Sequence, residues 1–260
     1  MAAEPVHREA AIGFDRAADA YERARPSYPA DAVAHVVAQL GIDGSSRVVD
    51  LAAGTGKFTR LLVPTGATLV AVEPVEGMRR VLEEVVPGIE VHTGTAEAIP
   101  LPDESVDAMV CAQAFHWFDG PAALAKIRRV LRPGRGVAVV FNIRDESEPW
   151  VAELTRITGV ETAPRPHHTA SRAAFAGHVA DDGGLGPVTV TTFRYVQPLD
   201  EASLVERVTS QSWIAAMEPD EREALLDGVR ELARTHPDLA GRERFEMPYD
   251  TEVAICHRRP

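Results

Sequence analysis

Short apolar runs alternate with amphipathic segments over residues 47–143. The apolar runs are nearly continuous, which is typical of parallel strands buried on both faces of a sheet. The segments between them place apolar residues three or four apart and end at Gly or Pro, which predicts helices. Strands and helices in alternation predict right-handed crossovers and a doubly wound α/β sheet. The expected strands are RVVDLA (47–52), ATLVAVEP (67–74), IEVHTG (89–94), VDAMVCAQA (106–114) and GVAVVFNI (136–143).

Two more strand-like segments follow, PVTVTTFRYVQPLD (187–200) and DTEVAICHRR (250–259). Between them lie two helical patterns, over residues 200–217 and 220–236. The simplest arrangement adds both strands to the same sheet. We therefore predict a seven-stranded mixed sheet that is mostly parallel, with the last strand antiparallel.

The predicted sheet leaves one amino-terminal segment and two internal segments outside it. Residues 1–30 carry a helical pattern broken by prolines, which we interpret as a flap. Residues 31–260 are expected to form a single domain. Two helical insertions, at about 144–187 and 200–240, contain Pro- and Gly-rich turns, and we expect them to cap a substrate site.

Composition and charge narrow the class of protein. Of the 260 residues, 45% are hydrophobic and 25% charged, and no apolar run reaches 18 residues, so we expect a soluble protein without a membrane partner. The first residues lack the features of a secretion signal, which favours the cytoplasm. With 39 acidic and 27 basic residues the net charge is -12, which disfavours a nucleic-acid partner because such binding depends on neutralised phosphates. Cys111 and Cys256 have no ligand-spaced neighbours and are expected to be reduced thiols.

The segment RVVDLAAGTGKFT (47–59) places an acid at the end of a strand, before a small-residue turn that opens a helix. A phosphate-binding NTPase loop is excluded, because Lys57 is followed by Phe58 and the first glycine is absent. The dinucleotide fingerprint is only half made, because Thr59 stands where the third small residue belongs. Asp50 would repel a pyrophosphate, whereas it would attract a ligand with a cationic amino group, such as S-adenosylmethionine (SAM).

Residues after the second and third strands suit the adenosine part of such a ligand. Glu73 lies 19 residues beyond Gly54, where its carboxylate can accept from both ribose hydroxyls, each bond contributing roughly 1.5–3 kcal/mol. Thr95, Ala96 and Glu97 follow the third strand and are placed to face an adenine. The alternative is a glycine turn required only for the strand-to-helix geometry, with Glu73 a solvated strand end.

In these motifs the chain resembles the class I SAM-dependent methyltransferases of the methyltransferase-type-11 group. Four segments carry the resemblance in order: VVDLAAGTGKFT, VAVEPVEGM, GTAEAIPLPDESVD and RVLRPGRGVAVV. It covers residues 27–143, and the segments at 21–29 and 245–259 more weakly resemble the branch that contains trans-aconitate methyltransferase-like enzymes. Ala52 departs from the pattern, because many members have Gly there. The resemblance implies a Rossmann-like fold with SAM as methyl donor and S-adenosylhomocysteine (SAH) as product.

The resemblance also implies which residues hold the cofactor. Asp50 would contact the amino group of SAM, Gly54 and Gly56 would let the backbone approach it, and an Arg25 or Tyr21 on a closed flap would hold its carboxylate. A surface helix with a solvated arginine is the alternative for the flap. The expected set is Tyr21, Arg25, Asp50, Ala52, Gly54, Gly56, Glu73, Pro74, Met78, Thr95, Ala96, Glu97 and Gln113, although Met78 at helical spacing can equally belong to the core.

The acceptor side is expected beyond the fourth strand. Gln113 ends that strand, and His116 and Trp117 follow it, at an edge where open α/β sheets bind ligands. An imidazole can accept a proton from a hydroxyl acceptor, an effect of about 10²–10⁴ in rate, or it can only shape the pocket. Trp213 is expected in the core or in the wall of the acceptor pocket. His167 and His168 are adjacent, but no third ligand is suitably spaced, so no metal is expected.

These observations predict an enzyme that moves the methyl group of SAM to a small-molecule acceptor, at a carboxylate or hydroxyl oxygen. The alternatives are a C- or N-methyltransferase of secondary metabolism and a protein that binds SAM without transferring methyl. A nicotinamide oxidoreductase is disfavoured by the missing third glycine of its fingerprint. The acceptor and the oligomeric state stay open.

Overall fold

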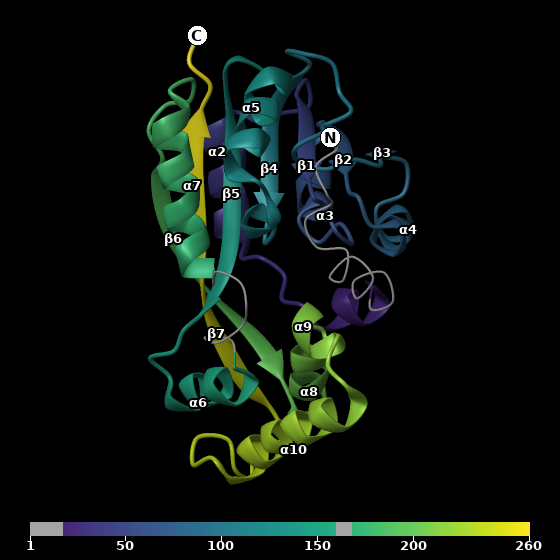
Figure 1. Cartoon of the computed structure of the whole chain (residues 1–260), viewed down its shortest axis with the longest axis vertical. Helices are drawn as coiled ribbons and strands as arrows, with labels where there is room; N and C mark the ends of the chain where they lie inside the picture. Colours follow the sequence, from purple (N-terminus) through teal and green to yellow (C-terminus); the bar gives the residue numbers. More distant parts are fainter. Residues whose placement is uncertain (1–17, 160–167) are drawn as a thin grey trace.

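One mixed sheet runs through the computed structural model, which describes residues 18–159 and 168–260 (Figure 1). Its strand order is β3-β2-β1-β4-β5-β7-β6. Strands β1 to β5 pair in parallel, whereas β7 is antiparallel to both β5 and β6. This confirms the predicted doubly wound, seven-stranded sheet. The strands are β1 Arg47–Leu51, β2 Thr68–Val72, β3 Glu90–His92, β4 Val106–Ala112, β5 Leu131–Arg144, β6 Thr189–Leu199 and β7 Phe245–His257.

Helices follow most strands, as the alternating pattern predicts. The pattern over residues 200–217 divides into two helices, since the chain turns at Ser210 and Gln211. Residues 18–24 of the predicted flap are helical, and residues 1–17 lie outside the described part. The helices are α2 Ala30–Leu40, α3 Thr59–Leu62, α4 Glu76–Val85, α5 Gly120–Val130, α6 Pro149–Thr158, α7 His168–Asp182, α8 Glu201–Thr209, α9 Ser212–Ala215 and α10 Pro219–Thr235, with 3-10 turns η1 Val63–Thr65 and η2 Phe115–Trp117.

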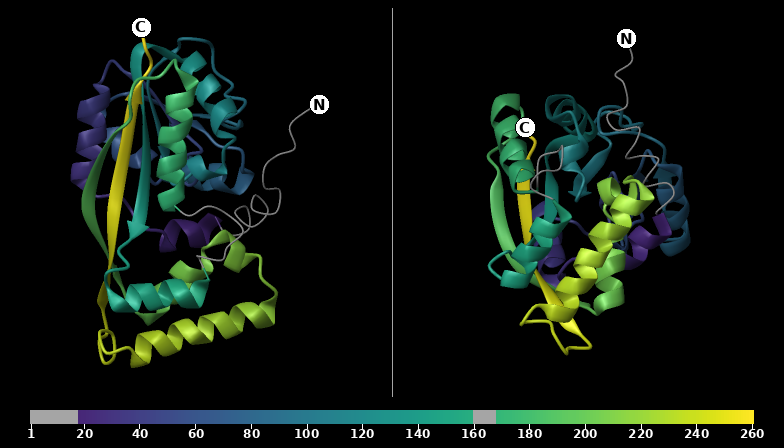
Figure 2. Two further views of the ribbon diagram at one scale, coloured as in Figure 1. Left: turned by 60° about the vertical axis from the view of Figure 1, so that its left-hand side comes forward. Right: turned by 60° about the horizontal axis from the view of Figure 1, so that its bottom comes forward.

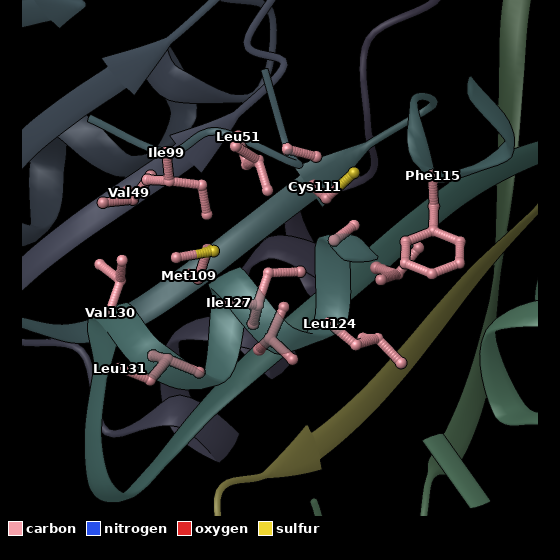
Figure 3. Close-up of a cluster of buried hydrophobic side chains, with 14 of the residues drawn as sticks. Val49, Leu51, Ile99, Met109, Cys111, Phe115, Leu124, Ile127, Val130 and Leu131 are labelled. Atoms are coloured by element: carbon pink, nitrogen blue, oxygen red, sulfur yellow. The ribbon is translucent and has the colours of Figure 1, made fainter. Parts of the chain in front are cut away.

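Two apolar cores hold helices against opposite faces of the sheet, because successive side chains of a strand point to opposite faces. On one face, Val49 and Met109 pack against Ile127 of α5 (Figure 3). On the other face, Val48 and Val110 belong to the cluster that α2 completes. The buried strands thereby form a rigid platform whose carboxyl ends share one edge, and it is at that edge that such sheets bind ligands.

A third apolar cluster forms a separate cap below the parallel part of the sheet (Figure 1). Helices α6, α8 and α10 pack there on the far ends of β6 and β7, where Phe245 and Met247 are buried. Helix α7 lies elsewhere: its Phe175 and Val179 belong to the main core, against α5 and β5. The segment expected as one insertion at 144–187 therefore supplies α6 to the cap and α7 to the sheet.

Strands β5 and β7 connect the sheet to the cap. They pair from Gly136 opposite His257 to Arg144 opposite Tyr249, well beyond the last pair of β4 and β5. The flap helix lies between the sheet and the cap helices α8 and α9 (Figure 2). In the described part of the chain, no helix is both long and apolar enough to span a bilayer.

Candidate functional site

The loop after β1 adopts left-handed backbone conformations at three positions. Gly54 has φ 56° and Gly56 has φ 79°. A Cβ on Gly56 would lie 3.1 Å from Cγ of Leu82 in α4, whereas a Cβ on Gly54 would meet no atom within 4 Å. Gly56 is thus required for the packing of α4, while Gly54 borders open space. Of the two glycines, Gly54 alone has the open surroundings expected where a ligand approaches the backbone.

Ala52 is the third left-handed residue of this loop, with φ 56°. This conformation brings its Cβ close to the following carbonyl and costs roughly 1–2 kcal/mol. The backbone is fixed there by the Ala52 amide, which donates to Val72 O at 2.7 Å. The departure from glycine at this position therefore stores strain, which proteins typically retain at functional sites.

Asp50, at the end of β1, is 2% exposed. Its Oδ2 accepts a hydrogen bond from the Thr59 hydroxyl at 2.6 Å, and its Oδ1 has no hydrogen-bond partner among the described residues. Burial raises the pKa of Asp50 to about 7; the Thr59 hydrogen bond acts against this shift, and the charge of Glu73 adds to it. Thr59, which breaks the dinucleotide fingerprint, thus serves as the hydroxyl partner of the buried acid.

Glu73 is fixed in place at the end of β2. Its Oε2 accepts from the Gly54 amide and its Oε1 from the Val75 amide, both at 2.9 Å. Burial raises its pKa, and these two amide donors oppose the shift. Each carboxylate oxygen keeps a further lone pair that can accept from a ligand hydroxyl.

The flap contacts this loop through a residue that sequence reasoning did not single out. Glu22 accepts from the Thr55 hydroxyl at 2.6 Å, forms an ion pair with Arg60, and lies 3.7 Å from Nζ of Lys57. Burial lowers the pKa of Lys57, and Glu22 counteracts it. An acid in the middle of a polar helix gives no sequence signal for such a contact, because its partners lie more than 30 residues away.

The flap also contacts the cap. The Arg25 guanidinium lies 4.9 Å from the centre of the Tyr21 ring and donates to Ser210 O, at the end of α8, at 3.1 Å. Flap, loop and cap therefore border one space, which residues of all three line.

That space is a pocket with an empty volume of about 540 Å³, which includes space open to solvent. Small-molecule sites are typically about 300–1,000 Å³. The pocket brings together five residues of the predicted cofactor set: Tyr21, Arg25, Ala52, Gly54 and Gln113. Its other lining residues are Pro26, Tyr28, Ala53, Thr55, Lys57, Phe58, Ala112, Asn142 and Arg207.

Gln113 and Asn142 line the pocket from the ends of β4 and β5. Gln113 has φ 57°, and its side-chain amide donates to Asn142 O at 3.1 Å. The Asn142 amide donates to Ser27 O at 2.8 Å, while its oxygen accepts from the Thr251 hydroxyl at 2.6 Å. Asn142 was not predicted, although a polar residue inside the run GVAVVFNI is a usable signal.

The residues predicted on the adenine side lie outside the lining of this pocket. Met78 is 3% exposed and packs with Ala18 and Val81, so it joins the flap helix to α4. Pro74 is exposed between β2 and α4.

Thr95, Ala96 and Glu97 form a turn after β3, also outside this lining. Thr95 is exposed and Ala96 is buried in the main core. An oxygen of Glu97 accepts from the Asp119 amide at 2.9 Å, at the start of α5. The turn borders the sheet edge where the carboxyl ends of the strands lie.

The acceptor-side residues lie in two places. His116 and Trp117 form η2 beyond β4, with ring centres 5.0 Å apart, and the His116 ring is 6.1 Å from that of Phe141. Trp213 in α9 packs against the apolar cluster of the cap. None of these residues belongs to the lining of the pocket. Among the described residues, no group of three or more His, Cys, Asp or Glu side chains could hold a metal ion, and His167 lies outside the described part.

Sequence comparisons with known proteins point to methyltransferases. A family model described as "Methyltransferase domain" matches residues 49–139. An uncharacterized methyltransferase of Mycobacterium tuberculosis (strain ATCC 25618 / H37Rv) is 38% identical over 259 residues, which is 96% of each chain. A malonyl-[acyl-carrier protein] O-methyltransferase of Methylococcus capsulatus (strain ATCC 33009 / NCIMB 11132 / Bath) is 44% identical over 100 residues, 36% of each chain.

The fold is also found among solved structures. The geranyl diphosphate C-methyltransferase of Streptomyces coelicolor A3(2), in complex with Mg²⁺, geranyl diphosphate and SAH, has a TM-score of 0.50 at 13% identity. The alignment covers 88% of this chain and 78% of that one. At this identity the likeness shows the fold alone.

Proposed function

Because the chain belongs to the class I SAM-dependent methyltransferases, we propose that it methylates a carboxylate or hydroxyl oxygen of a small-molecule acceptor in the cytoplasm. A carboxylate is the favoured acceptor. We assign the role of a substrate cap to the flap and to the helices α6, α8, α9 and α10, of which α8 lines the pocket through Arg207.

The residues present fit SAM. Asp50 Oδ1 has no protein partner in the described part of the chain, the Gly54 backbone borders open space, and the Glu73 oxygens keep lone pairs for ribose hydroxyls. SAM supplies an electrophilic methyl group on a positively charged sulfur. Asp50 would hold its amino group, Glu73 its ribose, and Tyr21 with Arg25 its carboxylate.

The adenine side of the cofactor site is proposed along β2 and β3. Pro74 and Met78 at the start of α4, together with the turn of Thr95, Ala96 and Glu97, lie at the carboxyl ends of these strands. The exposed Thr95 and the partly buried Glu97 leave polar atoms at the surface of that edge.

One observation carries the preference for a carboxylate acceptor. The described residues that line the pocket include no His, Asp or Glu that can act as a general base. Tyr28 is buried, which raises its pKa well above the ordinary value, and Lys57 is paired with Glu22. A carboxylate is already deprotonated at neutral pH, so its transfer needs positioning alone, and orientation can supply roughly 7–11 kcal/mol.

A hydroxyl acceptor would instead need a base, and His116 is the proposed one, with Trp117 and Trp213 shaping the acceptor side. His116 lies at the carboxyl end of β4, close to the pocket residue Gln113 in sequence. For this residue to act, its ring must reach an acceptor from outside the lining of the pocket. His116→Ala with unchanged turnover on the true acceptor would leave only a structural role for His116.

The proposal is tested by incubating the protein with SAM labelled in the methyl group and a panel of small organic acids, each matched with its neutral amide. We expect label in a base-labile ester, together with SAH, from an acid and not from its amide. Label in an amide, an amine or a carbon product would contradict transfer to oxygen. SAH binding without transfer to any acid, amide, phenol or amine would favour a SAM-binding protein without transferase activity.

A further inference from the structure

Three arginines from three different parts of the chain gather beside the pocket. Arg25 comes from the flap, Arg144 from the cap-side end of β5, and Arg207 from α8. Arg25 and Arg207 line the pocket itself. Arg207 is only 6% exposed, which is unusual for a charged side chain without an ionic partner.

The guanidinium groups are close enough to repel one another. Burial lowers the pKa of Arg25 to about 10 and that of Arg144 to about 10, and in each case the charge of Arg207 is the next largest cause. Tyr21 faces Arg25, while Tyr249 and Glu146 face Arg144, and these groups act in the opposite direction. They do not neutralise the cluster, because two of the three are phenols.

Four nitrogen atoms of this cluster are buried without a hydrogen-bond partner in the described part of the chain: Nε of Arg25, Nη1 of Arg144, and Nε and Nη1 of Arg207. No carboxylate of the described residues lies within ion-pair distance of any of the three guanidinium groups, whereas other arginines such as Arg60 and Arg234 have such partners. A folded chain rarely leaves buried donors unpaired, and a buried charge without a partner lowers stability strongly. The cluster therefore has the positive charge and the unpaired donors that an anion requires.

We propose that Arg144 and Arg207 bind an acidic group of the methyl acceptor, a carboxylate or a phosphate, next to the Arg25 that holds the cofactor. The inference rests on the proposed methyl transfer and adds the charge of the acceptor to it. Arginine suits this role because its planar fork pairs with both oxygens of such a group.

The number and position of the donors favour the acceptor over the cofactor as the source of the anion. One carboxylate can pair with one or two arginine guanidinium groups, whereas this cluster contains three. Arg25 is on the flap that contacts the glycine loop, whereas Arg144 lies at the far end of β5, opposite Tyr249 of the cap cluster. An anion bound there would join β5 to α8, and Arg25 already joins α8 to the flap through Ser210. Binding of the acceptor would thus hold the cap closed.

The test uses Arg144→Gln and Arg207→Gln, with Arg156→Gln as matched control. Arg156 is an exposed arginine of the same cap, paired with Glu153, so its removal changes the net charge equally. Calorimetry measures the binding of malonate and sulfate, with neutral malonamide for comparison, to the full-length protein with and without SAH. A parallel titration compares SAH with methylthioadenosine, which lacks the amino-acid carboxylate.

We expect malonate or sulfate to bind the wild-type protein, and both test variants to weaken this binding at least about tenfold while SAH binding changes less than twofold. Arg156→Gln should change neither. In the absence of anion, Arg207→Gln should unfold at a higher temperature than the wild type, because an unpaired buried charge is removed.

Three results would overturn the proposal. The first is that the wild type binds neither malonate nor sulfate, or that both variants bind them as tightly as the wild type does. The second is a tenfold loss of SAH affinity with unchanged methylthioadenosine affinity, which would assign the cluster to the cofactor carboxylate. If the glutamine variants do not fold, Arg144→Lys and Arg207→Lys replace them, because lysine keeps the charge but lacks the planar guanidinium group. The third contradicting result is unchanged anion binding in both lysine variants. Absence of SAH binding by the wild type refutes the methyl-transfer proposal, while anion binding without SAH still reports on the cluster.

Discussion

Asp50→Asn isolates the electrostatic cost of the buried Asp50 carboxyl group. Burial raises the pKa of this group from 3.8 to about 7. Between these two values the folded chain holds a proton that the unfolded chain has released, so the group makes the protein less stable as the pH rises. Asparagine is similar in size, can accept the Thr59 hydrogen bond, and carries no charge at any pH.

The magnitude follows from the shift in pKa. At about 1.36 kcal/mol per unit, the Asp50 carboxyl lowers stability by about 4 kcal/mol at pH 8, where it is ionised, and by about 2 kcal/mol at pH 5, where folding requires it to take up a proton. The new amide group would stand where Oδ1 has no described partner, and an unpaired donor costs about 1–3 kcal/mol at either pH. This second cost cancels when the two pH values are compared. The stability of the variant relative to the wild type should therefore increase by about 2–3 kcal/mol from pH 5 to pH 8.

Urea unfolding of both proteins without ligand, followed by tryptophan fluorescence between pH 5 and pH 8, measures this difference. Asp181→Asn serves as the control, because Asp181 is an exposed acid on α7 and its removal should leave the pH dependence of stability unchanged. Parallel stability curves for the wild type and Asp50→Asn would refute the account of Asp50 as a buried, destabilising carboxyl.

Four further substitutions test the loop and its acid partner. Glu73→Gln should weaken SAH binding by about 2 kcal/mol, the value of a lost charged hydrogen bond, whereas the exposed control Glu76→Gln should not; equal affinities by calorimetry would remove Glu73 from the ribose site. Gly54→Ala should cost about 1–2 kcal/mol of stability for its positive φ alone, and Gly56→Ala about 2–4 kcal/mol, because its Cβ also meets α4; equal losses in denaturant unfolding would contradict the packing role of Gly56. Ala52→Gly should stabilise the protein by about 0.5–1 kcal/mol, because it relieves about 1–2 kcal/mol of backbone strain and adds the smaller entropy cost of a glycine. A lower melting temperature of the variant would show that Ala52 is unstrained.

The sheet could be predicted because its signals are local. Each buried strand is an apolar run bounded by turn residues, and the acid and glycines of the loop at 50–56 stand in fixed spacing to it. The destination of α7 could not be predicted in this way. Phe175 and Val179 form an ordinary apolar stripe, and nothing in that stripe says whether it packs on the sheet or in the cap.

The pocket was predicted only in part, because its residues come from distant segments of the chain. Tyr21, Gly54 and Gln113 belong to motifs and were expected there. Arg207 lies on α8 like any polar residue of an amphipathic helix, and its burial against the flap depends on how the cap folds back over the sheet edge. Glu22 was missed for the same reason, since its partners are set by the closure of the flap onto the loop.

The central claim is that the Asp50, Gly54 and Glu73 site binds SAM, and calorimetric titration of the purified protein with SAM and with SAH tests it most directly. We predict micromolar binding of both by the wild type, with SAH affinity reduced in Glu73→Gln and retained in Glu76→Gln. Absence of binding of either compound by the wild type would contradict the claim and leave the glycine loop a purely structural turn.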